Sequence, residues 1–298
     1  MRTAFIQQLI EEARIHEELF LLVGDLGFSV VEPFAEAFPD RFLNVGIAEQ
    51  NMTGVAAGLA KEGYNVFTYS IGNFPTLRCM EQIRYDVCYH DLSVKIVAVG
   101  GGYAYGPLGV SHHTTEDIGM LRTIPNITVT APGDPVETKL VTRHFAAAKG
   151  PGYIRLGKAG EPLVHTHVPE WSFGDILPVQ ILPDASIAVL TTGGMLADAV
   201  NAVETGALQA SVYSIPVIKP IDEAGLLGVL QTHSEIITME EHQHSSGFGS
   251  AVLEAAHRLY AAKKLTHMPV IRVIAIPDRF IGYAGTQEYL RREAGLFL

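Results

Sequence analysis

Short apolar segments alternate with helical stretches along the whole chain. In the first half, runs of Val, Ile, Leu, Phe and Tyr bounded by turn residues predict strands at 19–25, 41–46, 65–70, 94–100, 127–132 and 153–157. Apolar residues at helical spacing predict helices at 3–16, 48–62, 75–89, 116–122 and 134–147. Strands and helices that alternate in this way are typical of a parallel sheet covered by helices.

A second alternation follows a proline-rich stretch. Residues 160–185 contain four prolines and neither a helical nor an alternating period, which indicates a linker. After it, the pattern predicts strands at 186–192, 210–215, 235–241 and 269–276, helices from about 195, 222 and 247, and a short final helix. We therefore expect an α/β protein with two open sheets wrapped by helices. A first domain, a linker and a second domain are expected at residues 1–165, 166–181 and 182–298.

The composition narrows the classes of function. A chain of 298 residues with 48% hydrophobic residues can bury the cores of two domains. The net charge is -11 and the basic residues are scattered, so we expect neither nucleic acid nor an anionic membrane surface as a partner. The N-terminal residues lack the apolar core of a signal peptide, and no later run approaches the length of a membrane span. We expect a cytoplasmic protein that binds small molecules and other proteins.

The cysteine and histidine patterns predict no metal site. Cys79 and Cys88 lie nine residues apart on one predicted helix, too far to form a disulfide, and are expected to be buried free thiols. The histidine pairs at 165–167 and 242–244, HTH and HQH, have the spacing of one strand face but no third ligand nearby in the sequence. We expect no metal at either pair.

Glu49 stands at an unusual place in the pattern. It follows the predicted strand at 41–46 and begins a helix that reads GVAAGLA from Gly54 to Ala60. A helix of small apolar residues needs packing on every side. The carboxylate at its start is either held by the helix dipole, an interaction of about 0.3–1 kcal/mol, or is a buried acid that shares a proton with a bound base. The residues alone leave both interpretations open.

Three segments resemble one family of enzymes. RFLNVGIAEQNM, GVSHHTTEDIGMLRTIPNITVTAPGD and YIRLG occur in the order and at about the spacing found in the C-terminal half of transketolases and deoxyxylulose phosphate synthases. The resemblance covers essentially the whole chain. It implies a pyrimidine-binding domain followed by the C-terminal domain of a thiamine diphosphate enzyme. Such a chain is the C-terminal subunit of a split transketolase, which moves a two-carbon ketol unit from a ketose to an aldose.

The resemblance also implies which residues bind the cofactor. In the family, the glutamate that matches Glu49 bonds to a ring nitrogen of the aminopyrimidine and stabilises the imino tautomer, which takes the proton from the thiazolium carbon. Phe74 matches a position that packs against the pyrimidine, and Asp25 matches one near the cofactor. Ile71 and Leu77 stand where some transketolases have further aromatics, so we expect an apolar but less aromatic pocket.

Three further residues match substrate-binding positions of the family, and a fourth competes with one of them. His112 matches the histidine that points at the substrate hydroxyls near the reacting carbon, with His113 as its competitor. Ser29 matches a serine near the phosphate of the substrate. Arg155 matches an arginine that clamps this phosphate, as a forked guanidinium can. On residue type alone, a strand-end arginine paired with a surface carboxylate is an equal alternative for Arg155.

Two positions depart from the transketolase pattern. Gly100 stands where transketolases have a phosphate-contacting histidine, and Leu108 stands where they have an aspartate that reads hydroxyl stereochemistry. The donor is therefore expected to differ from an ordinary pentulose phosphate, and whether it is phosphorylated stays open. The arginine of the synthase loop DRAG is also absent, which disfavours deoxyxylulose phosphate synthesis.

The chain lacks the diphosphate-binding half of such enzymes. GDL at 24–26 with Asn51 mimics the GDG and asparagine of the family's magnesium site, but Leu26 replaces the last glycine and Asn51 falls inside the Glu49 motif. We therefore expect no metal site in this chain. Thiamine diphosphate and Mg2+ are expected to be held with a partner, the N-terminal transketolase subunit, in an α2β2 heterotetramer.

Two rival interpretations stay open. The beta subunit of a 2-oxoacid dehydrogenase shares the GIAEQ type of motif and also lacks the diphosphate half, although HHTTEDIGMLRTIPNI and Arg155 are closer to transketolase. The other rival is a non-catalytic subunit of the same fold. The departures at Gly100 and Leu108 keep it open, whereas the presence of Glu49 speaks against it.

Overall fold

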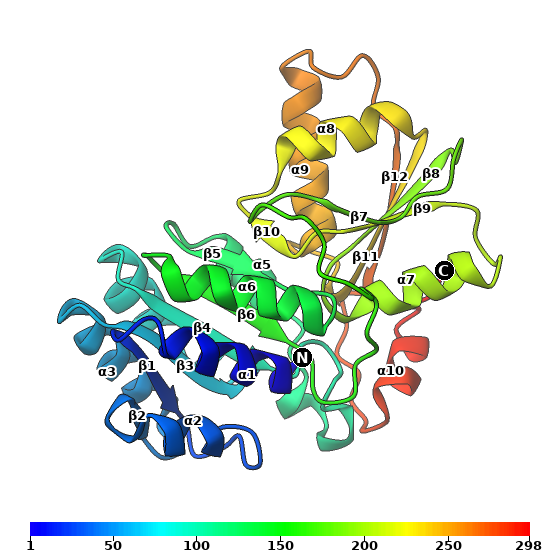
Figure 1. Ribbon diagram of the computed structural model, residues 1–298. Coiled ribbons are helices and arrows are strands. Elements are labelled where there is room, and N and C mark those ends of the chain that lie inside the picture. Colours follow the sequence, from blue (N-terminus) through cyan, green and yellow to red (C-terminus); the bar gives the residue numbers. More distant parts are fainter.

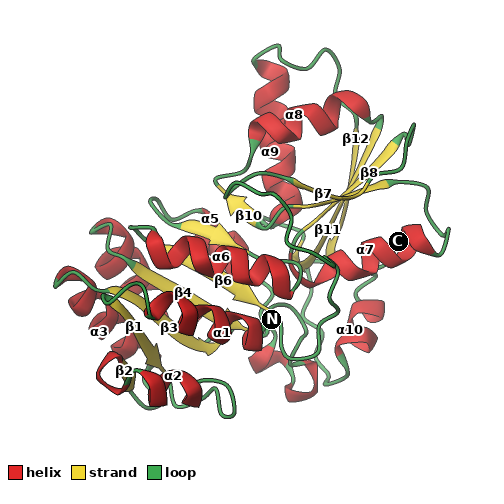
Figure 2. Cartoon of the chain, viewed as in Figure 1, coloured by secondary structure: helices red, strands yellow, loops and turns green.

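The computed structural model describes residues 1–298, and its strands form two sheets, as Figure 1 and Figure 2 show. The first sheet contains β1 (Leu19–Val23), β2 (Phe42–Asn44), β3 (Asn65–Ile71), β4 (Val94–Val99), β5 (Thr128–Thr130), β6 (Gly152–Leu156) and β10 (Val217–Lys219). The second contains β7 (Leu177–Gln180), β8 (Ile187–Thr191), β9 (Ser211–Ser214), β11 (Glu235–Gln243) and β12 (Val270–Ile276). The strand orders are β10-β5-β6-β4-β3-β1-β2 and β12-β11-β8-β9-β7.

Helices cover the sheets, which confirms the expected α/β class. The α-helices are α1 (Arg2–Ala13), α2 (Glu32–Ala37), α3 (Glu49–Lys61), α4 (Met80–Gln82), α5 (Asp117–Arg122), α6 (Pro135–Ala147), α7 (Leu196–Glu204), α8 (Glu223–Thr232), α9 (Phe248–Ala261) and α10 (Gln287–Glu293). On the first sheet, α1 and α6 lie side by side on one face (Figure 1). The helix α3 packs against β3 from the other face.

The buried strands explain why both faces of the first sheet carry helices. Every residue of β4 is buried, which is why its sequence VKIVAV is almost continuously apolar rather than alternating. Along β1, Leu21 and Val23 join the core under α1 and α6, whereas Leu22 joins the core under α3. The core under α3 continues into the second domain, where it includes Leu226 and Phe248. This one of the three core clusters therefore extends through both domains.

Two edge strands differ from the expected arrangement. The strand β10 comes from residues expected in the second domain, but it pairs antiparallel with β5 at the edge of the first sheet. The strand β7 lies within the expected linker and pairs antiparallel with β9. Both sheets are therefore mixed rather than parallel. These strands have three and four residues, which is too few for an alternating period to be visible.

The other predicted strands and helices are present, with their ends shifted by a few residues. The helix expected at 75–89 is irregular, because it joins a 3-10 turn (Leu77–Cys79), α4 and a π-helical segment (Ile83–Tyr89). Cys79 and Cys88 are buried free thiols, as expected. None of the helices combines the length and the apolar character that crossing a membrane requires.

Candidate active site

Glu49 begins α3 at the edge where the strands of the first sheet end. Its side chain is 2% exposed and accepts two hydrogen bonds, from Ser70 Oγ at 3.1 Å and from Arg78 Nη1 at 2.9 Å. Ser70 and the half-buried Ile71 are the last residues of β3. The carboxylate therefore lies at the carboxyl edge of an α/β sheet, which is the edge at which such proteins bind ligands.

Arg78 links Glu49 to two other expected site residues. Its guanidinium carbon lies 4.8 Å from the centroid of the Phe74 ring. Phe74 in turn packs edge-on against His112, with ring centroids 5.3 Å apart. Ser111 Oγ lies 3.0 Å from Nδ1 of His112. Side chains from three separate motifs thus form a continuous row of carboxylate, guanidinium, aromatic ring and imidazole, which we call the Glu49 row.

Arg78 was not among the residues expected from the sequence. The spacing of Arg78 was one indication, because a residue four positions after Phe74 in a helical turn lies on the same face as Phe74. A second signal was physical, because a buried carboxylate needs a partner for its charge. Neither signal selects Arg78 over other nearby cations until the fold brings it to Glu49.

Asp25 and Ser29 lie on the exposed loop between β1 and α2. Both have left-handed backbone conformations, with φ of 53° and 63°. Asn44 Nδ2 donates to Asp25 Oδ1 at 3.0 Å, and Asp25 N donates to Asn44 Oδ1 at 3.1 Å. The N–H of Ser29 donates to Glu32 Oε1 at 2.8 Å. Their expected contacts with cofactor and substrate stay predictions.

His113 faces a different part of the molecule from His112. Together with Leu77 it lines a cavity of about 280 Å3, whose other wall comes from the second domain and includes Arg279 and Phe280. His113 is 4% exposed, its ring lies edge-on to Tyr103 with centroids 5.0 Å apart, and its Nε2 has no hydrogen-bond partner. Burial lowers the pKa of His113, so the ring is neutral near pH 7. Of the two neighbouring histidines, His112 is the one in the Glu49 row.

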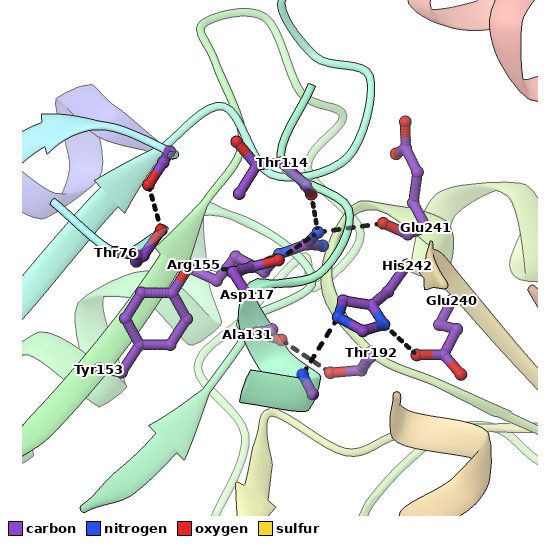
Figure 3. Close-up of polar contacts among 12 residues, drawn as sticks. Thr76, Thr114, Asp117, Ala131, Tyr153, Arg155, Thr192, Glu240, Glu241 and His242 are labelled. Atoms are coloured by element: carbon purple, nitrogen blue, oxygen red, sulfur yellow. Dashed lines mark hydrogen bonds and ion pairs between the residues drawn. The ribbon is translucent and has the colours of Figure 1, made fainter. Parts of the chain in front are cut away.

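Arg155 has different partners from those expected, as Figure 3 shows. Its Nε donates to Asp117 Oδ2 at 2.8 Å, and its Nη2 donates to the main-chain oxygens of Thr114 at 2.6 Å and Glu241 at 3.0 Å. Two of the three guanidinium nitrogens are therefore engaged inside the chain. The expected contact of Arg155 with a substrate phosphate stays a prediction. Arg155 is paired with a carboxylate, as in the alternative interpretation, although this carboxylate, Asp117, is buried rather than at the surface.

The structure gives a physical reason for the departure at Gly100. This residue has a φ of 95°, and a Cβ placed there would lie 2.2 Å from Cδ2 of Tyr105. The Tyr105 ring therefore fills the space that a histidine at position 100 would need. Leu108, the other departing position, is 55% exposed. Neither position presents a polar side chain to a substrate.

One cluster in the chain has the composition of a metal site. Asp134, Glu137 and His165 bring three potential ligand atoms within 4.8 Å of one another, which the HTH spacing did not reveal. These atoms are already hydrogen-bonded, because Asp134 accepts from the N–H groups of Glu137 and His165, and His165 Nε2 lies 2.9 Å from Glu137 Oε1. Burial alone would lower the pKa of His165, but the hydrogen bond and charge of Glu137 outweigh it and raise this pKa. These hydrogen bonds hold the segment at His165, at the end of the expected first domain, against the start of α6.

The residues of the Glu49 row fit the aminopyrimidine of thiamine diphosphate. Glu49 has a buried carboxylate of the kind that can bond to a ring nitrogen, and Phe74 has an aromatic ring of the kind that can pack against one. The one three-ligand cluster of the chain, at Asp134, contains no residue of this row. On the exposed side of α3, a Cβ at Gly54 or Gly58 would meet no atom within 4 Å, so another chain can pack closely there.

Comparison with known families identifies both domains of the chain. Residues 1–160 match the transketolase pyrimidine-binding domain, and residues 179–296 match the transketolase C-terminal domain. The chain belongs to the transketolase family. Transketolase-type domains in this order also confirm the expected fold class.

Several relatives of this transketolase-family chain have similar length. A putative transketolase C-terminal section of Methanocaldococcus jannaschii is 37% identical, with 99% of this chain and 92% of that protein covered. An apulose-4-phosphate transketolase subunit of Phocaeicola vulgatus is 32% identical, with 96% and 90% covered. Among solved structures, a split-gene transketolase described as an inactive beta4 tetramer has a TM-score of 0.84 and 32% identity, with 99% and 93% covered.

Proposed function

We propose that this chain is the C-terminal subunit of a split, thiamine diphosphate-dependent transketolase. The enzyme transfers a two-carbon ketol unit from a ketose to an aldose, with phosphorylated or otherwise anionic sugars as substrates. The observation that carries the proposal is the Glu49 row at the carboxyl edge of the first sheet. Relatives of similar length that are named as transketolase sections or subunits support it.

Each residue of the row has a task toward the cofactor, which supplies the nucleophilic carbon when bound. Glu49 binds a nitrogen of the pyrimidine ring and holds a proton there. Phe74 packs against the face of the ring. Arg78 has 47% of its side chain exposed, so it has room to leave Glu49 Oε2 when the ring takes its place. The ion pair thus compensates the buried charge of Glu49 until the cofactor binds.

His112 supplies the contact with the sugar in this proposal. Its imidazole hydrogen-bonds a substrate hydroxyl near the reacting carbon, and the packing against Phe74 sets its distance from the cofactor. The absence of polar side chains at Gly100 and Leu108 points to a donor other than an ordinary pentulose phosphate. Two relatives support anionic sugars, because their names contain apulose-4-phosphate and 6-deoxy-6-sulfo-D-fructose.

A partner chain completes the site in this proposal. The N-terminal transketolase subunit holds Mg2+ and the diphosphate, and the two kinds of subunit form an α2β2 heterotetramer. The open face of α3 at Gly54 and Gly58 lies on the same helix as Glu49, which supports an interface next to the cofactor. The relatives whose names describe one subunit of a transketolase also support a second kind of subunit.

Binding and turnover test the proposal separately. Titration of thiamine diphosphate and Mg2+ into the purified chain should show no tight binding, and addition of the partner subunit should create it. Tight binding by the isolated chain would contradict the partner requirement. The assembled complex should then transfer ketol units. Oxidative decarboxylation of a 2-oxoacid without ketol transfer would identify a 2-oxoacid dehydrogenase beta subunit, and assembly with neither activity would identify a non-catalytic subunit.

A further inference from the structure

The loop that carries His112 is closed at its base by two residues. Gly102 and Thr114 form an isolated antiparallel bridge, in which Gly102 N donates to Thr114 O at 2.7 Å and Thr114 N donates to Gly102 O at 2.9 Å. Residues 103–113, which we call the His112 loop, project from this bridge. The position of His112 therefore depends on where the bridge is held.

Glu241, from the second domain, holds the bridge on both sides. Its Oε1 accepts the N–H of Tyr103, the residue after Gly102, at 2.7 Å. Its main-chain oxygen accepts Arg155 Nη2 at 3.0 Å, and the same nitrogen donates to Thr114 O at 2.6 Å. In Figure 3 the Arg155 guanidinium lies between Thr114 and Glu241. One residue of the second domain thus contacts one end of the loop directly and the other end through Arg155.

The carboxylate of Glu241 is itself fixed by its own domain. It is 4% exposed, and its Oε2 accepts Arg291 Nε at 2.9 Å and Gln287 Nε2 at 3.0 Å, both from α10. Arg291 Nη1 also donates to Asp198 Oδ2 at 2.7 Å. On the loop side the fit is close, because Gly102 has a φ of 64° and a Cβ there would lie 2.4 Å from Glu241 Cγ. A buried charge with all these partners has one favoured position.

We propose that Glu241 is a positioning residue for His112, so that the second domain takes part in ketol transfer through the loop it holds. The inference rests on the proposed function of His112. The four side chains of the Glu49 row all come from the first domain, yet Glu241 sets the base of the loop whose His112 packs on Phe74. Misplacement of a catalytic group by about 1 Å lowers a rate by about 100-fold, so a small shift of the bridge is sufficient.

A double-mutant cycle in the complete complex with partner and cofactor tests this inference. Glu241→Ala removes the acceptor of the Tyr103 N–H and should lower kcat/KM for the donor sugar by about 100-fold. In a His112→Ala background the same substitution should have little further effect, because Glu241 acts through His112. Asp198→Asn is the matched control, since it breaks the other ion pair of Arg291 and leaves the Tyr103 contact in place. Equal losses in both backgrounds, or an equal loss in Asp198→Asn, overturn the inference.

Hydrogen exchange supplies a readout that does not depend on turnover. The amides of Tyr103 and Thr114 should exchange faster in Glu241→Ala than in wild type. In Glu241→Gln, whose Oε1 still accepts the Tyr103 N–H, exchange and activity should both be partly restored. Unchanged exchange at both amides in Glu241→Ala overturns the inference. Glu241→Asp, which shortens the side chain, replaces the alanine variant if that variant fails to fold.

The two readouts also separate the inference from the function on which it rests. If the wild-type complex transfers no ketol unit, the proposed function fails. The exchange rates then still decide whether Glu241 holds the His112 loop. If the wild-type complex transfers ketol units but the effects of Glu241→Ala and His112→Ala are additive, the result supports the proposed function and contradicts the positioning role of Glu241.

Discussion

Arg78 Nη1 lies 2.9 Å from the buried Oε2 of Glu49, and the same guanidinium covers the ring of Phe74 at 4.8 Å. One partly exposed cation therefore bridges the two residues that are expected to contact the pyrimidine. In the proposed function, a ring nitrogen takes the place of Arg78 at Glu49 Oε2. We therefore expect different effects from substitution of Glu49 and from substitution of Arg78.

Glu49→Gln should abolish turnover and leave assembly intact. The amide keeps the size of the side chain and can still accept from Ser70, but it cannot exchange a proton with a ring nitrogen. Loss of a positioned acid–base group lowers rates by about 10²–10⁴-fold. Ketol transfer by the complex, together with size-exclusion chromatography, measures both properties. Glu12→Gln changes another buried carboxylate, at 6% exposure, and is the control. Unchanged turnover in Glu49→Gln would favour the non-catalytic alternative.

Arg78→Met should destabilise the chain by about 1–3 kcal/mol, because it leaves the buried Glu49 carboxylate without its charged partner. Arg84→Met is the control, since Arg84 pairs with Glu81 at 3.9 Å with both side chains mostly exposed, and such pairs contribute about 0–1 kcal/mol. Urea unfolding of the isolated chain measures both. A loss in Arg78→Met no larger than in Arg84→Met would show that the ion pair does not support Glu49.

His112→Ala and His113→Ala should have different effects although the residues are neighbours. His112 belongs to the Glu49 row, so its loss should lower kcat/KM for the donor by about 100-fold or more. His113 packs on Tyr103 beside a separate cavity, so its loss should mainly lower stability. Steady-state kinetics and thermal unfolding of both variants make the comparison. A larger kinetic loss in His113→Ala would reverse the assignment.

Lys95 should make the stability of the chain depend on pH. It is fully buried in β4, and burial lowers its pKa from 10.5 to about 7. Between these values the unfolded chain binds a proton that the folded chain does not, so the free energy of unfolding rises with pH. This contribution is present above pH 10.5 and is lost as the pH falls through about 7.

Comparison of Lys95→Met with wild type isolates the contribution of Lys95 to the pH dependence of stability. The free energy of unfolding of Lys95→Met should exceed that of wild type most at pH 6 to 7, and the difference should shrink toward pH 10. Denaturant unfolding at a series of pH values measures it. Lys264→Met changes an exposed lysine and should show no such trend. A difference between Lys95→Met and wild type that is constant with pH would show that Lys95 stays charged when buried.

Most of the fold could be predicted because the physical requirements are local. A strand with helices on both faces, such as β4, has to be apolar at nearly every position, and a covering helix has to be apolar at every third or fourth position. The strands β7 and β10 escaped prediction because they are short edge strands. Each joins its sheet through hydrogen bonds to a strand far away in the chain, and no local pattern encodes that pairing.

In the candidate site too, the sequence predicted some residues, and only the fold revealed the contacts of others. Short motifs were sufficient to recognise the transketolase family and to select Glu49, Phe74 and His112, because each motif is contiguous in the chain. Folding alone brought Arg78 to Glu49 and brought Arg155 to Asp117 and to the main-chain oxygen of Glu241. The reason is that a buried charged side chain bonds to whichever opposite charge or main-chain oxygen the packing brings within hydrogen-bond distance. That distance depends on elements separated by tens of residues in the sequence.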